Sequence, residues 1–230
     1  MVFPRDFCVS STSLPVAGAS SALPGGAGEH HLQRQLGTGA RARRFYRDQV
    51  LDHLNPAMVD FVGRQRLMFL ATSGADGSCD STLRAGPPGF LQVLDDRTVT
   101  WPELRGNGVM ASLGNVTENP NVGLLLVDFF DDVIGLHING HAQIVDAEDA
   151  RRDGRVHDVE LAPGRRPSVW VEVAVEEAYV HCSKNIPHLS WRPDDLRLAG
   201  VRRKGGDYFR SIDTDSPWAG AACSGDGQAV

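Results

Sequence analysis

The sequence predicts a mainly β domain, an antiparallel barrel with flanking helices. Short apolar segments recur through the middle of the chain, and tight turns rich in Gly, Pro, Asp and Asn separate them. Few helical segments lie between the strands, so crossover helices of the kind that build a parallel βαβ sheet are missing. Closure into a barrel would also remove the exposed edges that such strands create.

The predicted elements begin with a helix and a hairpin. Asn55 is a suitable N-cap and Pro56 occupies the first helical position, where its missing N–H costs nothing, so we predict a helix over 56–66. Two strands follow at 67–72 and 79–85, joined by a turn of the Asp-Gly type.

The same alternation of turns and apolar runs continues towards the C-terminus. Strands are predicted at 90–94 and 98–101, and a short helix at 108–118 ends before the Asn-Pro pair that follows it. The remaining predicted strands cover 122–129, 134–145 and 168–176, and the last has Val at every second position.

Composition divides the chain into a core and two tails. Residues 1–40 are rich in Gly, Ser, Ala and Pro without periodicity, and we predict a disordered N-terminal tail there. Residues 204–230 predict a flexible C-terminal tail, which leaves 41–203 as a single domain.

Charge and cysteine content exclude several classes of protein. The net charge of −6 argues against a nucleic-acid-binding protein, which needs a basic face. The chain has no apolar run of the roughly 18 residues that a membrane span requires. Its four cysteines form no CxxC pair, which favours a cytoplasmic protein without a disulfide framework.

Several well-known motifs are missing from the sequence. We find no Gly-rich dinucleotide fingerprint, no phosphate loop, no nucleophile elbow and no HExxH pair. His137 and His141 would lie about 13 Å apart on a strand and could not share one metal ion. The sequence therefore predicts no metal site.

Two places in the stretch 80–119 could each hold an anion. Arg84 precedes a Gly-Pro-Pro-Gly turn and could offer a two-point fork to a phosphate, although an ordinary exposed arginine is the simpler interpretation. Asn107, between two glycines, precedes the helix, whose first N–H groups attract anions, although a plain Asn-capped turn fits equally well. Ser112 and Asn115 could hold polar ligand atoms or simply lie on the surface.

Longer segments carry a resemblance to a known family. They read FLATSGADGS, RAGPPGFLQVLDD, TVTWPELRGN, LGNVTENPNVGLLLVDF and LHINGHAQI, with YVHCSK further on. In this order they resemble the pyridoxamine 5′-phosphate oxidase-like family of FMN-binding split barrels, and more narrowly its predicted flavin-nucleotide-binding subgroup.

The resemblance implies a homodimer of six-stranded antiparallel Greek-key split barrels that binds two FMN molecules at its interface. The FMN phosphate would meet Arg84 and the helix start, and His181 and Lys184 would lie near the open face of the flavin as candidate catalytic residues that polarise it or relay a proton. The positions implied for cofactor binding are Thr82, Arg84, Trp101, Asn107, Ser112, Asn115 and His141.

The chain also departs from the pattern of this family. Gly108 and Val109 stand where relatives often carry basic residues, and His137 and His141 replace two arginines. A neutral histidine stabilises a phosphate less than arginine does near pH 7. The basic C-terminal motif of true pyridoxamine 5′-phosphate oxidases is not visible, so we do not expect that activity.

Two functions follow from the resemblance. The first is an FMN-dependent oxidoreductase acting on an unidentified small molecule, with the cofactor carrying the chemistry. The second is a non-catalytic protein that binds a flavin nucleotide, or a deazaflavin in its place. The apolar stretch 121–145 supports the homodimer, because a barrel core accounts for only part of its hydrophobicity.

Overall fold

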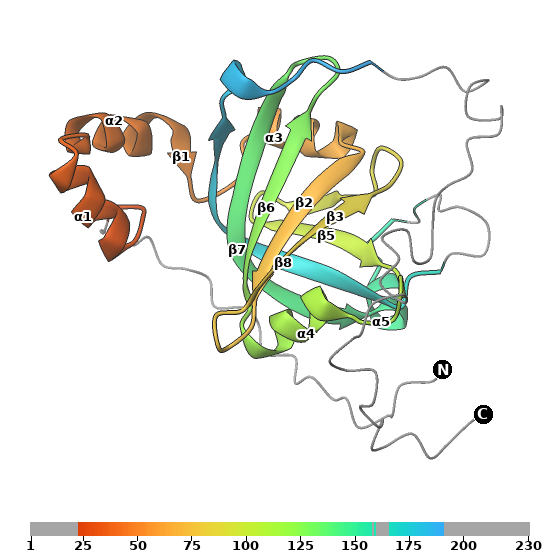
Figure 1. The fold of residues 1–230 in the computed structure, drawn as a ribbon. Helices are drawn as coiled ribbons and strands as arrows, with labels where there is room; N and C mark the ends of the chain where they lie inside the picture. Colours follow the sequence, from red (N-terminus) through yellow and green to blue (C-terminus); the bar gives the residue numbers. More distant parts are fainter. Residues whose placement is uncertain (1–22, 158, 160–165, 191–230) are drawn as a thin grey trace, which may run out of the picture. The chain divides into compact units, whose positions relative to one another are not determined.

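The computed structural model describes residues 23–157, 159 and 166–190 of the 230-residue chain. By its contacts the chain divides into Met1–Leu189 and Ser190–Val230, and the described residues belong to the first unit except for Ser190. This unit is built on one antiparallel sheet of eight strands (Figure 1).

The sheet runs in the order β3-β2-β6-β7-β8-β5-β4, and β1 pairs with β8 outside this path. The strands are β1 Val50–Leu51, β2 Leu67–Ser73, β3 Cys79–Ala85, β4 Gln92–Asp95, β5 Thr98–Glu103, β6 Asn121–Asp128, β7 Ile134–Asp146 and β8 Val169–His181. The helices are α1 Ala27–Gln35, α2 Gly39–Gln49, α3 Pro56–Arg64, α4 Ala111–Glu118 and α5 Ala147–Arg152, with the 3-10 helix η1 at Ser183–Asn185.

The predicted fold class is confirmed, although the sheet has eight strands instead of six. Helix α3 begins as expected: the Asn55 side chain accepts a hydrogen bond from the Met58 N–H at 2.9 Å, and Pro56 follows at the first helical position. Strand β8 continues to His181, so the YVH segment that the resemblance singled out lies on a strand.

Some described elements were not anticipated. Helix α1 and the start of α2 fall within residues 1–40, where we expected no regular structure. Helix α5 follows β7 directly, and Asp146 caps it by accepting hydrogen bonds from two backbone N–H groups. Residues 1–22 and 204–230 lie outside the described part of the chain, so the predicted domain boundaries stay predictions.

The core fills the inner face of the sheet. On this face the strands present buried apolar side chains at every second position, which is the alternation expected of a closed or nearly closed sheet. The central members are Met68, Leu70, Leu124, Leu126, Ile138, Val171 and Val173.

A bulge interrupts the long β7–β8 ladder between Asn139 and Gly140. A Cβ atom built at Gly140 would lie 2.0 Å from the backbone carbonyl oxygen of Ala174, so only glycine fits this close approach. Strand β7 can therefore bend at this bulge while it stays paired with β8 on both sides of it.

The sheet has two ends, β3 and β4, and no strand pairing joins them in the described residues. On β3 the residues Asp80, Thr82 and Arg84 share the inner face, because Arg84 pairs with Met68 and Thr82 with Leu70, both core residues of β2. Polar side chains are thus directed into the seam between the two ends of the sheet.

None of the helices in the described ranges is long and apolar enough to cross a membrane.

Candidate functional site

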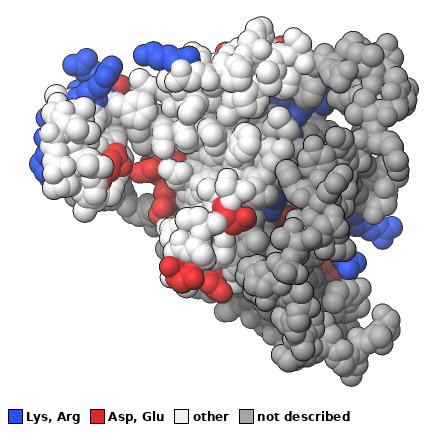
Figure 2. All heavy atoms as spheres, viewed as in Figure 1, with Lys and Arg blue, Asp and Glu red and all other residues white. Residues whose placement is uncertain are grey.

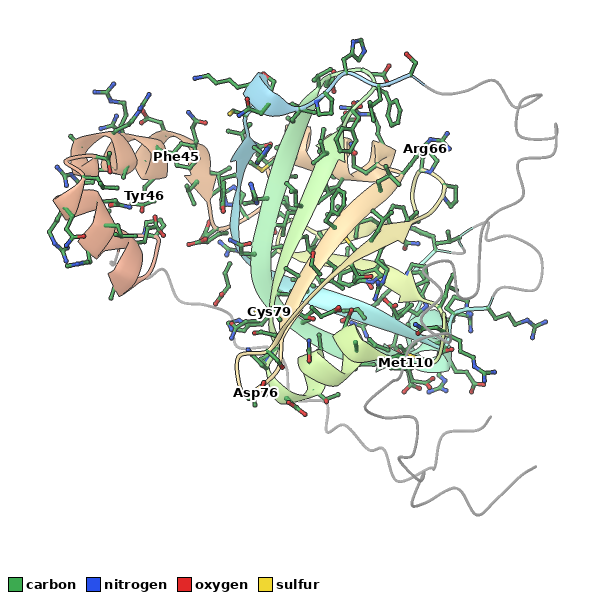
Figure 3. All side chains as sticks on the ribbon, in the orientation of Figure 1. Phe45, Tyr46, Arg66, Asp76, Cys79 and Met110 are labelled. Carbon is green, nitrogen blue, oxygen red and sulfur yellow. The ribbon has the colours of Figure 1, made fainter. Side chains whose placement is uncertain are left out.

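A pocket of about 290 Å³ opens at the seam of the sheet. Its walls come from the inner face of β3, the end of β5, the loop 104–110 and the first turn of α4. Met110, labelled in Figure 3, lies in the loop immediately before α4. We call this cavity the Arg84 pocket; it is lined by Asp80, Thr82, Arg84, residues 103–107 and residues 109–113.

Arg84 spans the seam through an ion pair with Glu103 at the end of β5. The Arg84 Nε donates to Glu103 Oε2 at 2.9 Å, and Arg84 Nη2 lies 2.8 Å from Glu103 Oε1. Arg84 Nη1 donates to the Thr82 hydroxyl at 3.0 Å. Because a guanidinium has further N–H donors, some remain for a ligand. The two charged side chains are 20% and 9% exposed, so the pair is largely shielded from water.

Trp101 contacts this pair from the core side. Its indole Nε1 donates to Glu103 Oε2 at 3.0 Å, and the residue is 0% exposed. The resemblance placed Trp101 beside the flavin ring, but in this structure it supports Glu103 and does not line the pocket. Thr82 does line it, as the resemblance implied.

Three residues of the loop before α4 have a left-handed backbone conformation. Gly106, Gly108 and Met110 have φ values of 54°, 84° and 58°, conformations that glycine adopts at little cost and methionine does not. The Asn107 side chain accepts a hydrogen bond from the Val109 N–H at 3.0 Å and so fixes the loop. Asn107 therefore shapes the wall of the pocket through its backbone turn.

Helix α4 begins at the pocket without a side-chain cap. Its N-cap residue is Met110, which makes no capping hydrogen bond, so the first backbone N–H groups of the helix are open to an anion. The Ser112 hydroxyl lines the pocket and donates to Asp80 Oδ2 at 2.7 Å. Asn115 instead donates to the Thr72 hydroxyl at 3.0 Å, which holds α4 on β2 outside the pocket.

Formal charge in the Arg84 pocket is balanced. Arg84 and Arg105 carry positive charge, while Asp80 and Glu103 carry negative charge. Arg105 is exposed, and its guanidinium has no hydrogen-bond or ion-pair partner among the described residues, so it is free to meet a ligand. The pocket suits an anion through directed N–H groups more than through excess positive charge.

The candidate catalytic residues lie on other elements. His181, at the end of β8, forms a 3.0 Å hydrogen bond between its Nδ1 and the Nε2 of His137 on β7. His137 in turn stacks on Tyr179, with ring centroids 4.7 Å apart. Lys184 is exposed in η1, three residues after His181. Neither His181 nor Lys184 lines the Arg84 pocket of the same chain.

His141 lies on β7, with its Nδ1 3.2 Å from Glu176 Oε1. Its side chain is 37% exposed, and it does not line the Arg84 pocket. Of the seven implied cofactor-binding residues, the structure therefore brings Thr82, Arg84, Asn107 and Ser112 together.

The histidine pair predicts a pH-dependent stability. Burial, followed by the charge of His181, lowers the pKa of His137 below 6.5, so the unfolded chain binds a proton more readily than the folded chain. The free energy of unfolding should therefore fall as the pH drops from about 7 to about 5. Urea unfolding at several pH values measures this slope.

His137→Gln should flatten that slope, and His141→Gln, on the same strand but outside the pair, should leave it as it is. An unchanged slope in His137→Gln would count against the assignment. The pKa of Asp52, lowered to about 2 by hydrogen bonds from His53 and Arg97, affects stability only at more acidic pH.

A comparison with protein-family models shows which family the chain belongs to. A family model described as pyridoxamine 5′-phosphate oxidase matches residues 54–182, more than half of the chain. The chain belongs to the pyridoxamine 5′-phosphate oxidase-like family. The matched range runs from the residue before the α3 cap to the end of β8, so the family region contains the whole Arg84 pocket.

A comparison with curated proteins gives no match. Solved structures of low similarity include HupZ from Group A Streptococcus, with 20% identity over 60% of this chain and 99% of that one and a TM-score of 0.41. A conserved hypothetical protein from Mycobacterium tuberculosis is 20% identical over 64% of this chain and 97% of its own, with a TM-score of 0.40. HutZ, the heme storage protein from Vibrio cholerae, is 16% identical over 55% and 94%, with a TM-score of 0.35. Identities and scores this low transfer neither ligand nor activity.

Two residues of the Arg84 pocket were missed in the sequence of this member of the pyridoxamine 5′-phosphate oxidase-like family. Asp80 and Glu103 both line the pocket and both pair with expected site residues. A signal for Glu103 was present, because it follows Val99 and Trp101 at strand spacing and so falls on a buried face. A carboxylate at a buried position needs a charged partner.

Proposed function

We propose that the chain is an FMN-dependent oxidoreductase whose Arg84 pocket holds the phosphate of the cofactor, and that it acts on a small molecule. The observation that carries the proposal is Arg84 itself, which is fixed across the seam and lines the same pocket as the uncapped start of α4. A bound flavin supplies the hydride or electron transfer. The residues of the chain supply binding and orientation.

The pocket fits a phosphate better than it fits a whole nucleotide. Its volume of about 290 Å³ is at the lower end of the range of roughly 300–1,000 Å³ that ligand pockets span. Arg84, Arg105 and the helix start favour the phosphate, while Asp80 and Glu103 oppose a second negative charge. The remainder of the nucleotide would have to extend beyond the pocket.

Each remaining site residue has a proposed task. Thr82 orients the Arg84 guanidinium, Asn107 holds the loop that presents the N–H groups, and the Ser112 hydroxyl holds the Asp80 carboxylate by donating to it. His181 is proposed to hold or move a proton at its Nε2, because its Nδ1 is engaged by His137. Lys184 is proposed to meet the flavin only when a second subunit brings it close.

The second candidate is a protein that binds a flavin nucleotide, or a deazaflavin, without turnover. It is favoured by one observation: His181 and Lys184 do not line the Arg84 pocket within one chain. If no subunit contact brings them near the cofactor, the chain offers no positioned proton donor among the candidates.

The deciding experiment is to purify the protein, reconstitute it with FMN and add NADH or NADPH under anaerobic conditions. A yellow protein that a reduced nicotinamide bleaches supports the oxidoreductase. A yellow protein that no nicotinamide bleaches supports the non-catalytic binder. A colourless protein that retains neither FMN nor a deazaflavin would contradict both functions.

We also propose a homodimer formed through the outer face of the sheet. Cross-strand pairing aligns the apolar side chains of Leu83, Phe69 and Leu125 in a row across three strands of this face. Leu83 and Phe69 are 50% and 37% exposed. Exposed apolar side chains of this kind would form the centre of an interface that buries about 800 Å² on each partner.

Light scattering of the FMN-loaded protein should therefore give the mass of two chains. Phe69→Glu combined with Leu83→Glu should give the mass of one chain and release FMN, because charges in the row would have to be desolvated in the dimer. Leu36→Glu, an equally drastic change at a residue that is 73% exposed outside the row, is the matched control. A monomeric wild-type protein with cofactor bound would rule the dimer out.

We propose a cytoplasmic location for the protein. Cys79 and Cys182 are free and exposed, and exposed free thiols suit a reducing compartment.

A further inference from the structure

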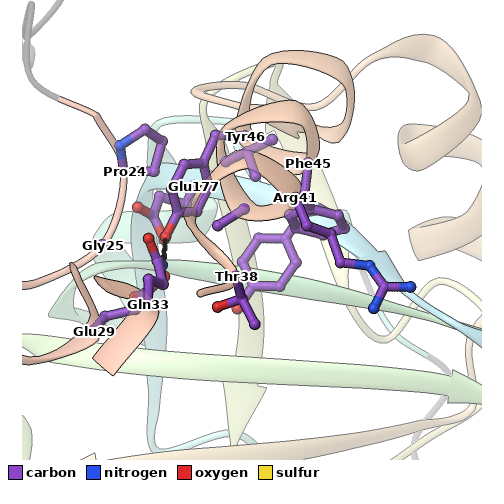
Figure 4. A pocket seen from close by; sticks show the side chains of 12 residues that line it. Pro24, Gly25, Glu29, Gln33, Thr38, Arg41, Phe45, Tyr46 and Glu177 are labelled. Carbon is purple, nitrogen blue, oxygen red and sulfur yellow. Dashed lines mark hydrogen bonds between the residues drawn. The ribbon is translucent and has the colours of Figure 1, made fainter. Parts of the chain in front are cut away.

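A second and larger pocket lies away from the seam, between the α1–α2 hairpin and strands β1 and β8. Its volume is about 610 Å³, within the range of pockets that take small organic ligands. Figure 2 shows Asp and Glu residues, in red, along the border between the hairpin, at the left of the view, and the strands. We call this cavity the Tyr46 pocket after the residue at its centre (Figure 4).

One wall of the Tyr46 pocket is a polar network on the hairpin. The Tyr46 hydroxyl donates to Glu29 Oε1, and the Gln33 amide donates to the same oxygen at 3.1 Å and to the Tyr46 oxygen at 2.5 Å. These bonds engage one oxygen of the Glu29 carboxylate. The other oxygen, Oε2, has no hydrogen-bond partner among the described residues and remains available.

A second carboxylate enters the pocket from the sheet. Glu177 lies on β8, and its Oε2 accepts a hydrogen bond from the Asn139 amide at 3.3 Å, which fixes its direction. The pKa of Tyr46 is raised by burial, by the hydrogen bond to Glu29 and by the charges of Glu29 and Glu177. Both carboxylates thus line the pocket near the Tyr46 hydroxyl.

The remaining walls are aromatic and apolar. Phe45 and Tyr179 meet edge to face, with ring centroids 5.9 Å apart, and Tyr46 adds a third ring. Aromatic faces attract cations, and they also bury the apolar part of a ligand. Arg41 is the one basic residue of the lining, and in Figure 4 its guanidinium points away from Glu29 and Glu177.

The backbone before α1 leaves room for the Glu29 carboxylate because residue 25 is a glycine. Gly25 has a φ of +92°, and a Cβ atom built there would lie 2.5 Å from Glu29 Oε2. A larger residue at position 25 would therefore be strained and would displace the carboxylate from the pocket.

We propose that the Tyr46 pocket binds an organic cation, a protonated amine that carries an apolar or aromatic group. The ammonium would be held by Glu29, Glu177 and the Tyr46 oxygen, and its apolar part by Phe45 and Tyr179. This selectivity is opposite in sign to that of the Arg84 pocket. Most of the lining precedes residue 54, outside the range that the family model matches, so the pocket is a feature that this chain adds to the family region.

Calorimetry on the full chain with 2-phenylethylammonium tests the proposal. We expect one site per chain, and no binding of 3-phenylpropionate, which has the same phenyl ring on a short chain and the opposite charge. 2-Phenylethanol, the neutral counterpart, should bind at least tenfold more weakly than the amine because it lacks the charge-assisted bonds, a difference of about 1.4 kcal/mol.

Three variants sharpen the test. Glu177→Gln should weaken amine binding about tenfold or more, while Glu176→Gln, the next residue on the strand and not part of the lining, should leave it unchanged. Phe45→Leu keeps an apolar wall without the aromatic face and should weaken binding about threefold. Because Glu177 is only partly buried, these variants are expected to fold, and their melting curves verify it.

Equal binding of the amine and the carboxylate, equal effects of Glu177→Gln and Glu176→Gln, or no binding of the amine would each overturn the proposal. A second subunit that fills the pocket would produce the last result. Since the readout is amine binding alone, the outcome does not depend on the proposed FMN function.

Discussion

Replacement of Arg84 by alanine is expected to lower the free energy of unfolding by roughly 3 kcal/mol, because Glu103 would stay buried without its partner. The Glu103 side chain is only 9% exposed, so water cannot replace the guanidinium easily. Urea unfolding of the protein without cofactor measures this effect. Arg84→Ala combined with Glu103→Gln should recover part of the stability, since the uncompensated charge is removed.

The same replacement is expected to weaken FMN binding about 10–150-fold, through the loss of a charge-assisted pair worth roughly 1.5–3 kcal/mol. Arg84→Lys should recover only part of the affinity, because a point charge cannot reproduce the fork. Riboflavin lacks the phosphate and should bind the wild type and Arg84→Ala about equally. If riboflavin weakens as much as FMN, Arg84 holds the fold or the ring and the phosphate assignment is wrong.

Glu103→Gln is expected to raise the affinity for FMN about tenfold, because removal of a carboxylate from a shielded pocket favours a dianionic ligand. The glutamine side-chain oxygen can still accept hydrogen bonds from Trp101 Nε1 and Arg84 Nε, while the contact of Arg84 Nη2 is lost because an amide NH2 group replaces the second carboxylate oxygen. Fluorescence titration with FMN measures the change, and riboflavin affinity should not move.

Glu118→Gln is the matched control for Glu103→Gln, because it removes the same charge from the exposed end of α4 outside the pocket. A fall in FMN affinity in Glu103→Gln, without an effect of the control, would mean that Glu103 positions Arg84 and that the ion pair binds the phosphate as a unit.

Local signals in the sequence were sufficient for most of the sheet. Turn residues marked the hairpins, and Asn55 with Pro56 marked the start of α3. Helix α1 was missed because it follows a stretch rich in Gly, Ala and Ser, and α2 was missed although it is rich in arginine; neither helix has a fully buried residue in the structure. For such segments composition is a poor guide to structure.

The site was predictable only in part, because its central contact is not local. Arg84 was selected through the family resemblance, because its position before a turn alone favoured an ordinary exposed arginine. Its partner Glu103 lies on β5, which is brought across the seam by a strand order that the sequence does not display. The resemblance implied Trp101 as a cofactor-binding residue, yet in the structure its side chain is fully buried in the core.

The open seam also has a consequence for the motions of the barrel. Strand β3 is bonded to β2 along one side only, and its other side is tied across the seam by side chains, of which the Arg84–Glu103 pair is the main charged contact in the described residues. Every second amide of β3 therefore lacks a strand partner and should exchange its hydrogen rapidly, while the amides of β2, paired on both sides, exchange slowly. An anion that competes with Glu103 for Arg84 would weaken this ion pair across the seam. Anion binding in the pocket should therefore change the hydrogen-exchange rates of the β3 amides.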